Sequence, residues 1–158
     1  MNNELIYKIL IYIDNNLEDN ISLDFLASSL FYNKDYLMRI FKRKFSVTII
    51  NYVNMLKIYK TLALYKSKSN NIAYIALSSN YNEPEYYTRI FKKLMGFTPF
   101  TYKKFINNYL SLDDDTYNKV LQKQIYLDTL MNTINNFKII YTPRQAPKTL
   151  SIFKDLSK

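Results

Sequence analysis

Residues 82–105, NEPEYYTRIFKKLMGFTPFTYKKF, carry the pattern from which the fold of the chain can be worked out. They predict a helix with a start signal and a stop signal. Asn82 is placed to cap the N-terminus, Pro84 suits the first turn, and Glu85 can complete a capping box with Asn82. Gly96, the single glycine of the chain, is expected to end the helix.

This predicted helix has one apolar face and one basic face. The apolar residues at helical spacing are Tyr87, Ile90, Phe91 and Leu94. The residues left outside this stripe are Tyr86, Arg89, Lys92 and Lys93. Many surface helices share such a pattern, so by itself it does not distinguish a binding helix from an ordinary surface helix.

The same text occurs a second time, earlier in the chain. Residues 39–43, RIFKR, correspond to residues 89–93, RIFKK, at an offset of 50. Three further positions match at this offset, in the pairs Tyr36 and Tyr86, Thr48 and Thr98, and Tyr52 and Tyr102. The chain is therefore expected to contain two copies of one unit.

The two copies differ by one residue in length. Asn33 corresponds to Asn82, and residues 26–27 correspond to residues 75–76, at an offset of 49 instead of 50. The second copy therefore has one extra residue in the turn between its two helices. A repeat with one slip in a turn predicts two helix-turn-helix units.

The second copy carries several short segments in a characteristic order. They are IAYIA at residues 72–76, NYN at 80–82, YTRIFKK at 87–93, GFTP at 96–99 and YKK at 102–104. With this combination the sequence resembles the DNA-binding domain of the AraC/XylS family of bacterial transcription regulators, over roughly residues 4 to 105.

Three positions depart from the family pattern. Asn80 stands where the family usually has glycine, Ser46 replaces the glycine after the first recognition helix, and Ile49 replaces a proline. Asparagine tolerates a left-handed backbone better than other non-glycine residues, so the first departure is mild. The other two leave the geometry of the first unit open.

The sequence predicts an all-α fold, with two helix-turn-helix subdomains joined by a long linker helix and followed by a short C-terminal helical extension. We expect an AraC-type DNA-binding domain over residues 1–110. Its expected parts are the first unit at about 4–47, the linker helix at about 48–66 and the second unit at about 72–109. The linker helix would fix the separation of the units, whereas a flexible linker would leave each to bind independently.

Residues 111–158 fall outside the resemblance and form an extension of unknown role. We expect an acidic start at residues 113–115, a helix over 116–137, one short strand at 138–141, and a tail with Pro143 and Pro147. The extension could pack on the domain, form a dimer, or be part of an effector module. The sequence does not decide among these roles.

The charge of the chain favours an anionic partner. The net charge is +9, and nine basic residues between positions 34 and 68 are opposed there by Asp35 alone. An AT-rich genome would explain part of the lysine and asparagine content, but it would not explain the clustering. Together with this charge, the resemblance implies double-stranded DNA as the partner.

The composition excludes several kinds of chemistry. The chain has no cysteine and no histidine, which rules out disulfides, zinc fingers, and thiol or imidazole catalysis. A single glycine cannot build a glycine-rich phosphate loop. We therefore expect no enzyme, no metal and no cofactor. Apolar runs too short for a bilayer, and an N-terminus unlike a signal peptide, predict a cytoplasmic protein without a membrane partner.

The resemblance implies a role for each recognition helix. The chain would be a sequence-specific transcription regulator that inserts two helices into successive major grooves, as a monomer, on a site of roughly 20 base pairs. The positions expected to face bases are Asp35, Met38, Arg39, Pro84, Glu85, Tyr86 and Arg89. The side chains better suited to phosphates are Lys34, Lys42, Arg43, Lys92 and Lys93.

An alternative from another class stays open at this point. The chain could be a protein-interaction module, whose C-terminal helix forms a dimer or contacts RNA polymerase, with DNA binding as a secondary property. Salt-dependent DNA binding by residues 1–110 would separate the two hypotheses.

Overall fold

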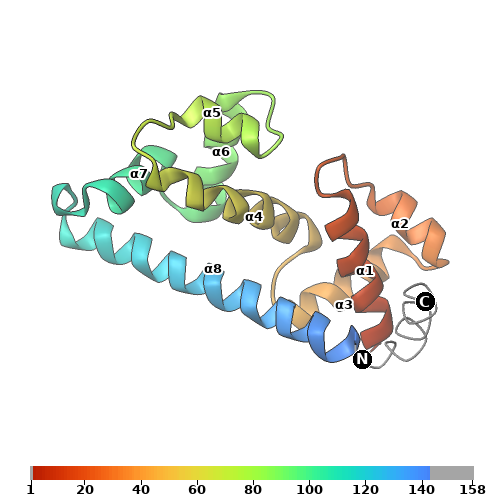
Figure 1. The fold of residues 1–158 in the computed structure, drawn as a ribbon. Coiled ribbons are helices and arrows are strands. Elements are labelled where there is room, and N and C mark those ends of the chain that lie inside the picture. Colours follow the sequence, from red (N-terminus) through yellow and green to blue (C-terminus); the bar gives the residue numbers. More distant parts are fainter. Residues whose placement is uncertain (1, 143–158) are drawn as a thin grey trace, which may run out of the picture.

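The computed structural model describes residues 2–142, and all regular secondary structure in this range is helical (Figure 1). The α-helices are α1 (Asn3–Asn16), α2 (Leu23–Leu30), α3 (Lys34–Phe45), α4 (Ile49–Thr61), α5 (Ile72–Ser78), α6 (Pro84–Met95), α7 (Pro99–Asn107) and α8 (Asp114–Tyr141). Two short 3-10 helices, η1 (Leu62–Lys66) and η2 (Tyr109–Ser111), follow α4 and α7. The tail with Pro143 and Pro147 lies outside the described residues.

The two predicted helix-turn-helix units have the same local geometry. Helices α3 and α6 each contain 12 residues and begin 50 positions apart. At the turns before them, the amides of Tyr32 and Tyr81 donate to the carbonyls of Ala27 and Ala76, at 3.0 and 3.1 Å. These turns are 49 positions apart, so the structure confirms the repeat and its single slip.

The predicted start of α6 is wrong by one residue. Asn82 lies one position too early, and Glu83 occupies the N-cap without a side-chain capping bond. Glu85 is exposed and forms no capping box. The extra residue of the second turn accounts for this, since it moves the asparagine away from the position that Asn33 holds before α3. Pro84 at the first helical position needs no partner for an amide hydrogen.

Both recognition helices end in the same way. Ser46 has φ 59° and Gly96 has φ 85°, and their amides donate to the carbonyls of Lys42 and Lys92 at 2.8 and 2.9 Å. The serine thus adopts the left-handed cap that the glycine adopts in the second unit. Its presence does not alter the geometry of the first unit.

The helices that follow also begin alike. Thr48 and Thr98 cap α4 and α7 by accepting from the amides of Asn51 and Thr101 at 3.1 and 3.2 Å. The next residue is the buried Ile49 in α4, where the second unit has a proline at the start of α7. The isoleucine fills the same place, so this departure too leaves the fold unchanged.

The expected linker helix is present, with a change of form near its end. Helix α4 runs to Thr61 and continues as the tighter η1 to Lys66. Helix α4 contacts α3, α6 and α8. It therefore touches both units and the C-terminal helix along its length.

The C-terminal extension is longer and more regular than expected. Helix α8 has 28 residues and begins after Asp113, which accepts from the amide of Thr116 at 2.8 Å. It runs along the lower side of the molecule from α7 to α1 in Figure 1. The strand predicted at 138–141 is wrong, because these residues form the last turn of α8. Contacts with α1 stabilise that turn, and such tertiary contacts are not visible in the local sequence.

Candidate nucleic-acid interface

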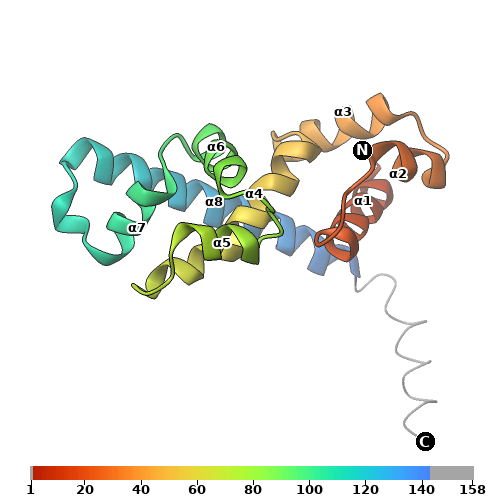
Figure 2. The same cartoon turned by 90° about the horizontal axis from the view of Figure 1, so that it is seen from above.

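The recognition helices α3 and α6 lie along the same edge of the molecule when it is seen from above (Figure 2). Each is about 18 Å long, because an α-helix rises about 1.5 Å per residue. Their inner faces are buried through residues at equivalent positions, among them Phe41 and Phe91. Their outer faces are left free to meet a ligand on one side of the protein.

An arginine stacks on a tyrosine at the same place in both units. The guanidinium carbon of Arg39 lies 5.7 Å from the ring centroid of Tyr36, and that of Arg89 lies 5.4 Å from the ring of Tyr86. Stacking of this kind restricts the guanidinium while leaving its donors available. The sequence matched the residues of each pair, but the contact between them was not predicted.

Each stacked tyrosine rests on another aromatic ring. Tyr36 stacks on Tyr32 at 5.6 Å between centroids, and Tyr86 packs on Tyr81 at 5.7 Å. Tyr81 is buried and donates its hydroxyl hydrogen to Oδ1 of Asn54 in the linker helix at 3.0 Å. The second pair is therefore anchored to the linker.

The remaining residues expected to face bases occupy the first half of each helix. Asp35 and Glu85 are exposed in the first turns. Met38 is half-buried and packs against the core, and Pro84 is half-buried at the start of α6. The acidic and arginine side chains are thus more accessible than Met38 or Pro84.

The residues expected to meet phosphates are all exposed. They are Lys34, Lys42, Arg43, Lys92 and Lys93. Lys34 also forms an ion pair with Asp24 at 3.0 Å. Exposed pairs of this kind contribute little to stability, so the lysine can exchange its partner for a phosphate at small cost.

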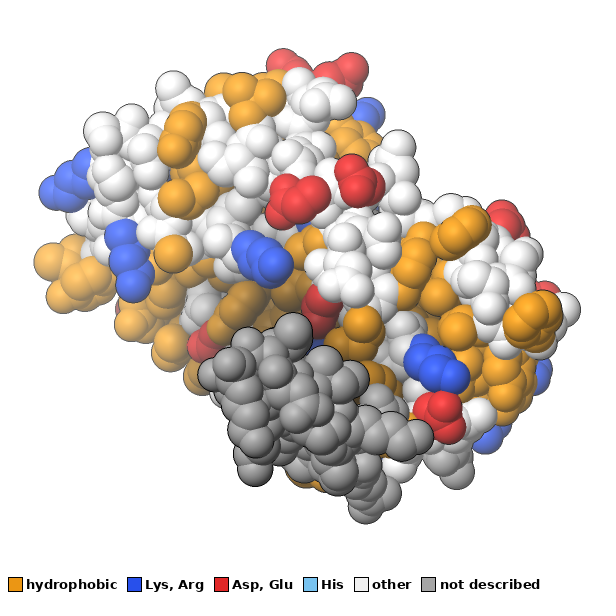
Figure 3. All heavy atoms as spheres, turned by 45° about the vertical axis from the view of Figure 1, so that its right-hand side comes forward, with side chains coloured by type: hydrophobic (Ala, Val, Ile, Leu, Met, Phe, Trp, Pro, Cys, Tyr) orange, Lys and Arg blue, Asp and Glu red, His pale blue; other side chains and the backbone are white. Residues whose placement is uncertain are grey.

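The basic side chains do not cover the surface uniformly. On the face shown in Figure 3, lysine and arginine side chains stand singly among polar, acidic and hydrophobic ones. The last turns of the recognition helices differ, because α3 has Lys42, Arg43 and Lys44 in sequence and α6 has Lys92 and Lys93. Each recognition helix therefore ends in a run of basic residues.

A hollow beside the N-terminus of α6 contains a further basic residue. Asn54, Lys57 and Tyr86 are among the residues that line it. The ammonium of Lys57 lies 5.7 Å from the ring centroid of Tyr81. The sequence assigned Lys57 to the basic cluster but gave it no site, since only the fold shows that this linker lysine lies beside a recognition helix.

A buried group of hydroxyls fixes the inner side of α6. The hydroxyl of Tyr87 lies 2.8 Å from that of Tyr65 and 3.3 Å from Oγ1 of Thr61, within hydrogen-bonding distance. Burial raises the pKa of both tyrosines above the ordinary value, so both stay protonated near neutral pH. These contacts join the second recognition helix to the end of the linker.

The described residues contain no group of acidic side chains arranged to hold a metal ion. Within residues 2–142, no helix combines the length and hydropathy needed to cross a bilayer. What the arrangement offers is two exposed basic helices that carry ordered guanidinium groups. Such groups donate paired hydrogen bonds to base edges and to phosphates.

Known proteins share this arrangement. A family model described as a helix-turn-helix domain matches residues 26–104, which is half of the chain. The chain is 29% identical over 100 residues to the transposon Tn10 TetD protein of Escherichia coli, covering 63% of this chain and 72% of that protein. It is 26% identical over 117 residues to the transcriptional activator AarP of Providencia stuartii, covering 74% and 81%.

Other relatives are much longer than the matched region. The match to the transcriptional regulator YisR of Bacillus subtilis is 24% identical over 96 residues and spans 61% of this chain but only 33% of that protein.

A Listeria innocua protein of unknown function has a similar structure, with TM-score 0.51 and 28% identity over 63% of this chain and 94% of that one.

The C-terminal domain of AraT, a response regulator from Geobacillus stearothermophilus, shares the fold with TM-score 0.52. It is 23% identical and covers 63% of this chain and 83% of that domain. The family match, the repeated units and the exposed basic helices agree with one another. The chain belongs to the AraC-type family of helix-turn-helix DNA-binding transcription regulators.

Proposed function

We propose that the chain regulates transcription in a bacterial cytoplasm by binding one asymmetric DNA site as a monomer, with α3 and α6 in successive major grooves. The observation that carries this proposal is the repeated Tyr–Arg pair on two helices of equal length, Tyr36 with Arg39 and Tyr86 with Arg89. Successive major grooves on one side of a duplex are about 34 Å apart.

The residues divide into those that read sequence and those that fix position. Arg39 and Arg89 donate paired hydrogen bonds to guanine, and Asp35 and Glu85 accept from cytosine. Met38, Pro84 and Tyr86 lie beside them and make shorter-range contacts to base edges. The lysines and arginine at the helix ends, together with Lys57 between the units, contact phosphates and carry little sequence information.

An interaction module without primary DNA binding has less support. The apolar stripe of α8, which the sequence offered for contact with a second chain or a polymerase subunit, is already buried within this chain through Val120, Leu127, Leu130, Met131 and Ile134. The apolar residues that α8 leaves exposed, such as Ile125 and Ile139, lie outside this stripe. We therefore place DNA binding first and RNA polymerase as a partner reached on DNA. We infer no catalytic role.

The test is a binding titration against duplexes selected from a random pool. Arg39→Ala and Arg89→Ala should each weaken specific binding by about 1–3 kcal/mol and relax preference at a different base position. The control is Arg43→Ala, which should weaken all sequences alike and reduce the salt slope of log affinity by about 1. Unchanged affinity and preference in both arginine variants would refute the assignment of α3 and α6.

A further inference from the structure

Helix α8 extends along both helix-turn-helix units and the linker between them (Figure 1). Its 28 residues give a length of about 42 Å at about 1.5 Å per residue. That length exceeds the spacing of about 34 Å between successive major grooves. The helix contacts α7, α4 and α1, so it touches the second unit, the linker and the first unit in turn.

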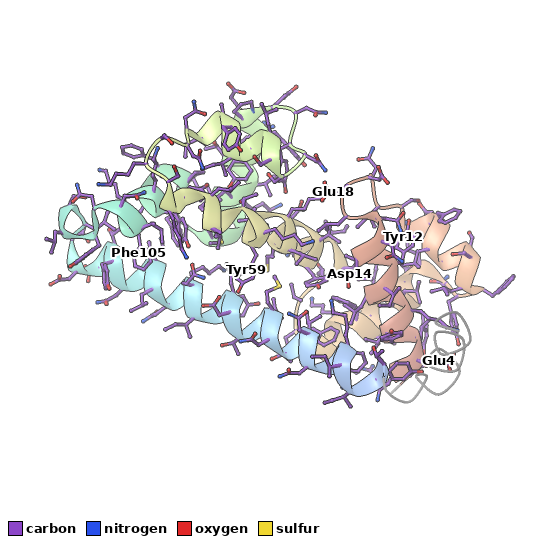
Figure 4. All side chains as sticks on the ribbon, in the orientation of Figure 1. Glu4, Tyr12, Asp14, Glu18, Tyr59 and Phe105 are labelled. Carbon is purple, nitrogen blue, oxygen red and sulfur yellow. The ribbon has the colours of Figure 1, made fainter. Side chains whose placement is uncertain are left out.

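The N-terminal half of α8 is attached to the second unit. The ring of Tyr117 lies 5.3 Å from that of Phe105, measured between centroids. Further along, Tyr102 donates its hydroxyl hydrogen to Oε1 of Gln124 at 2.7 Å. Both partners of α8 belong to α7, and Phe105 lies between the two helices in Figure 4.

The middle of α8 is attached to the linker helix. Tyr59 of α4 donates to Oδ1 of Asp128 at 2.7 Å, and Figure 4 shows Tyr59 between the two helices. The same carboxylate oxygen accepts from Nε2 of Gln124 at 3.2 Å. Through Gln124 this chain of hydrogen bonds continues to Tyr102, so Asp128 connects the linker with the second unit.

The C-terminal end of α8 is attached to the first unit. Phe137 packs edge-on against Phe45 of α3 at 5.8 Å between centroids. Lys138 forms an ion pair at 2.8 Å with Asp14 of α1, and the lysine side chain is only 21% exposed. This end therefore holds both the packing helix and the recognition helix of the first unit.

Apart from α4 and α8, the units meet through a polar contact at the surface. The side-chain amide of Asn80 donates to Glu18, to its backbone carbonyl at 3.1 Å and also to its carboxylate. Glu18 lies in the turn after α1, on the side of the second unit in Figure 4. An exposed contact of this kind constrains the units weakly compared with the buried side chains under α8.

We propose that α8 is a brace that holds the two recognition helices at a fixed separation and rotation, and that it thereby sets which spacing of DNA half-sites the chain accepts. The effect on half-site spacing rests on the proposed function, whereas the effect on the distance between the two units can be measured without DNA. Gln124, Asp128 and Lys138 are positioning residues, since they act through α7, α4 and α1.

The first experiment measures the distance between the units in the free protein. The absence of native cysteine allows spin labels at Ser28→Cys in α2 and Ala73→Cys in α5, which are exposed small residues. Pulsed electron paramagnetic resonance should give one narrow distribution of distances between the two labels in the full chain. Thr129→Pro should broaden it, because proline breaks α8 at an exposed position, and Thr129→Ala should leave it unchanged.

A second variant covers the case in which Thr129→Pro does not fold. The triple change Phe137→Ala, Lys138→Ala and Tyr141→Ala leaves α8 continuous but removes the ring contacts and the ion pair between its C-terminal end and the first unit. Circular dichroism first establishes that the helical content is retained. A distribution as narrow as that of the parent, in whichever variant is folded, would overturn the brace.

The second experiment tests the consequence on DNA. Coupling two binding modules raises avidity by about 10²–10⁴, so inserting five base pairs between the half-sites should weaken the parent about 100-fold or more. The same insertion should weaken a folded brace variant by less than about tenfold, since its units can reorient. Equal losses in parent and variant would contradict the brace. Absence of DNA binding in all proteins would refute the proposed function but leave the distance measurement valid.

Discussion

The first helix-turn-helix unit is packed mainly with aliphatic side chains, whereas the second is packed around tyrosines. Leu37 in α3 and Tyr87 in α6 occupy equivalent positions, and both are buried. Buried aliphatic residues in the helices of the first unit include Ile6 and Ile40. In the second unit the hydroxyl of Tyr87 lies 2.8 Å from that of Tyr65, whose ring packs edge-on against Tyr102. The same backbone therefore has two different kinds of core. The first contains one buried tyrosine, Tyr52, beside Phe41, whereas the second contains several.

This difference predicts that alkaline pH acts chiefly on the second unit. Burial raises the pKa of Tyr65, Tyr87 and Tyr102 above the ordinary value of about 10. A group whose pKa is raised in the folded state stabilises the fold below its unfolded pKa and loses that effect as pH rises further. The free energy of unfolding should therefore fall as pH increases above about 10.

Because several buried tyrosines act in the same direction, this is the largest effect that we predict. Urea unfolding at a series of pH values measures it, and amide NMR signals of α5 and α6 should be lost before those of α2 and α3. Tyr65→Phe should reduce the pH dependence, whereas the exposed control Tyr74→Phe should not. If the amide signals of both units disappeared at the same pH, and Tyr65→Phe and Tyr74→Phe had the same pH dependence, the two cores would not differ in their response to alkaline pH.

The parts of the fold that were predicted from sequence depend on local signals. Gly96 was expected to end its helix, and a cap of this kind depends only on the few residues around it, so the local pattern sufficed. Asn82 was misplaced because one inserted residue moves a cap without changing the composition of the turn. The final turn of α8 depends on residues more than 100 positions away, such as Asp14, and no local pattern encodes such contacts.

The candidate site was predicted to a similar extent. Helical spacing was enough to place Arg39 and Arg89 on the outside of their helices. It did not show that each stacks on a tyrosine, that Met38 is half-buried, or that Lys57 lies beside α6. These properties depend on rotamers and on neighbouring helices, which the sequence pattern does not specify.

The turns of the two units differ in how much backbone strain they carry. The first unit places Phe31 and Ser46 in the left-handed region, at φ 59° in both cases. The second places Asn80 there at φ 61° and Gly96 at φ 85°. Bulky side chains tolerate this conformation least, and Phe31 recovers little in packing because it is 94% exposed.

Replacing the strained residues of the first unit with glycine should therefore stabilise the chain. Phe31→Gly and Ser46→Gly are each expected to raise the free energy of unfolding by about 1 kcal/mol, and Gly96→Ser to lower it by about 1 kcal/mol. A Cβ at position 96 would lie 3.4 Å from Cε of Lys119, a flexible neighbour, so the cost comes from the backbone. Urea denaturation measures all three. Destabilisation by both glycine substitutions would show that the first unit carries no such strain.

The smallest predicted effect concerns the stacked pairs on the recognition helices. Tyr36→Leu and Tyr86→Leu should each weaken specific DNA binding by about 0.5–1 kcal/mol, the size of an exposed cation–π contact. Without the ring, Arg39 or Arg89 samples more rotamers before binding, so more freedom is lost when it docks on a base. The loss should be smaller than that caused by removing the arginine, and a double-mutant cycle with Arg39→Ala should show that the two changes are not additive.

The two units should respond differently in stability even where they respond alike in binding. Tyr86 packs on Tyr81, which is 5% exposed, whereas Tyr36 stacks on Tyr32, which is 41% exposed. Tyr86→Leu therefore disturbs the residue Tyr81, whose hydroxyl is anchored to the linker, whereas Tyr36→Leu disturbs the exposed ring of Tyr32 and the part of the core on which Tyr36 packs. The matched controls Tyr36→Phe and Tyr86→Phe keep the ring and should bind DNA as the parent does. If phenylalanine weakened DNA binding as much as leucine does, the tyrosine hydroxyl and not the ring face would contribute the affinity. The stacking geometry that the two units share would then have no role in recognition.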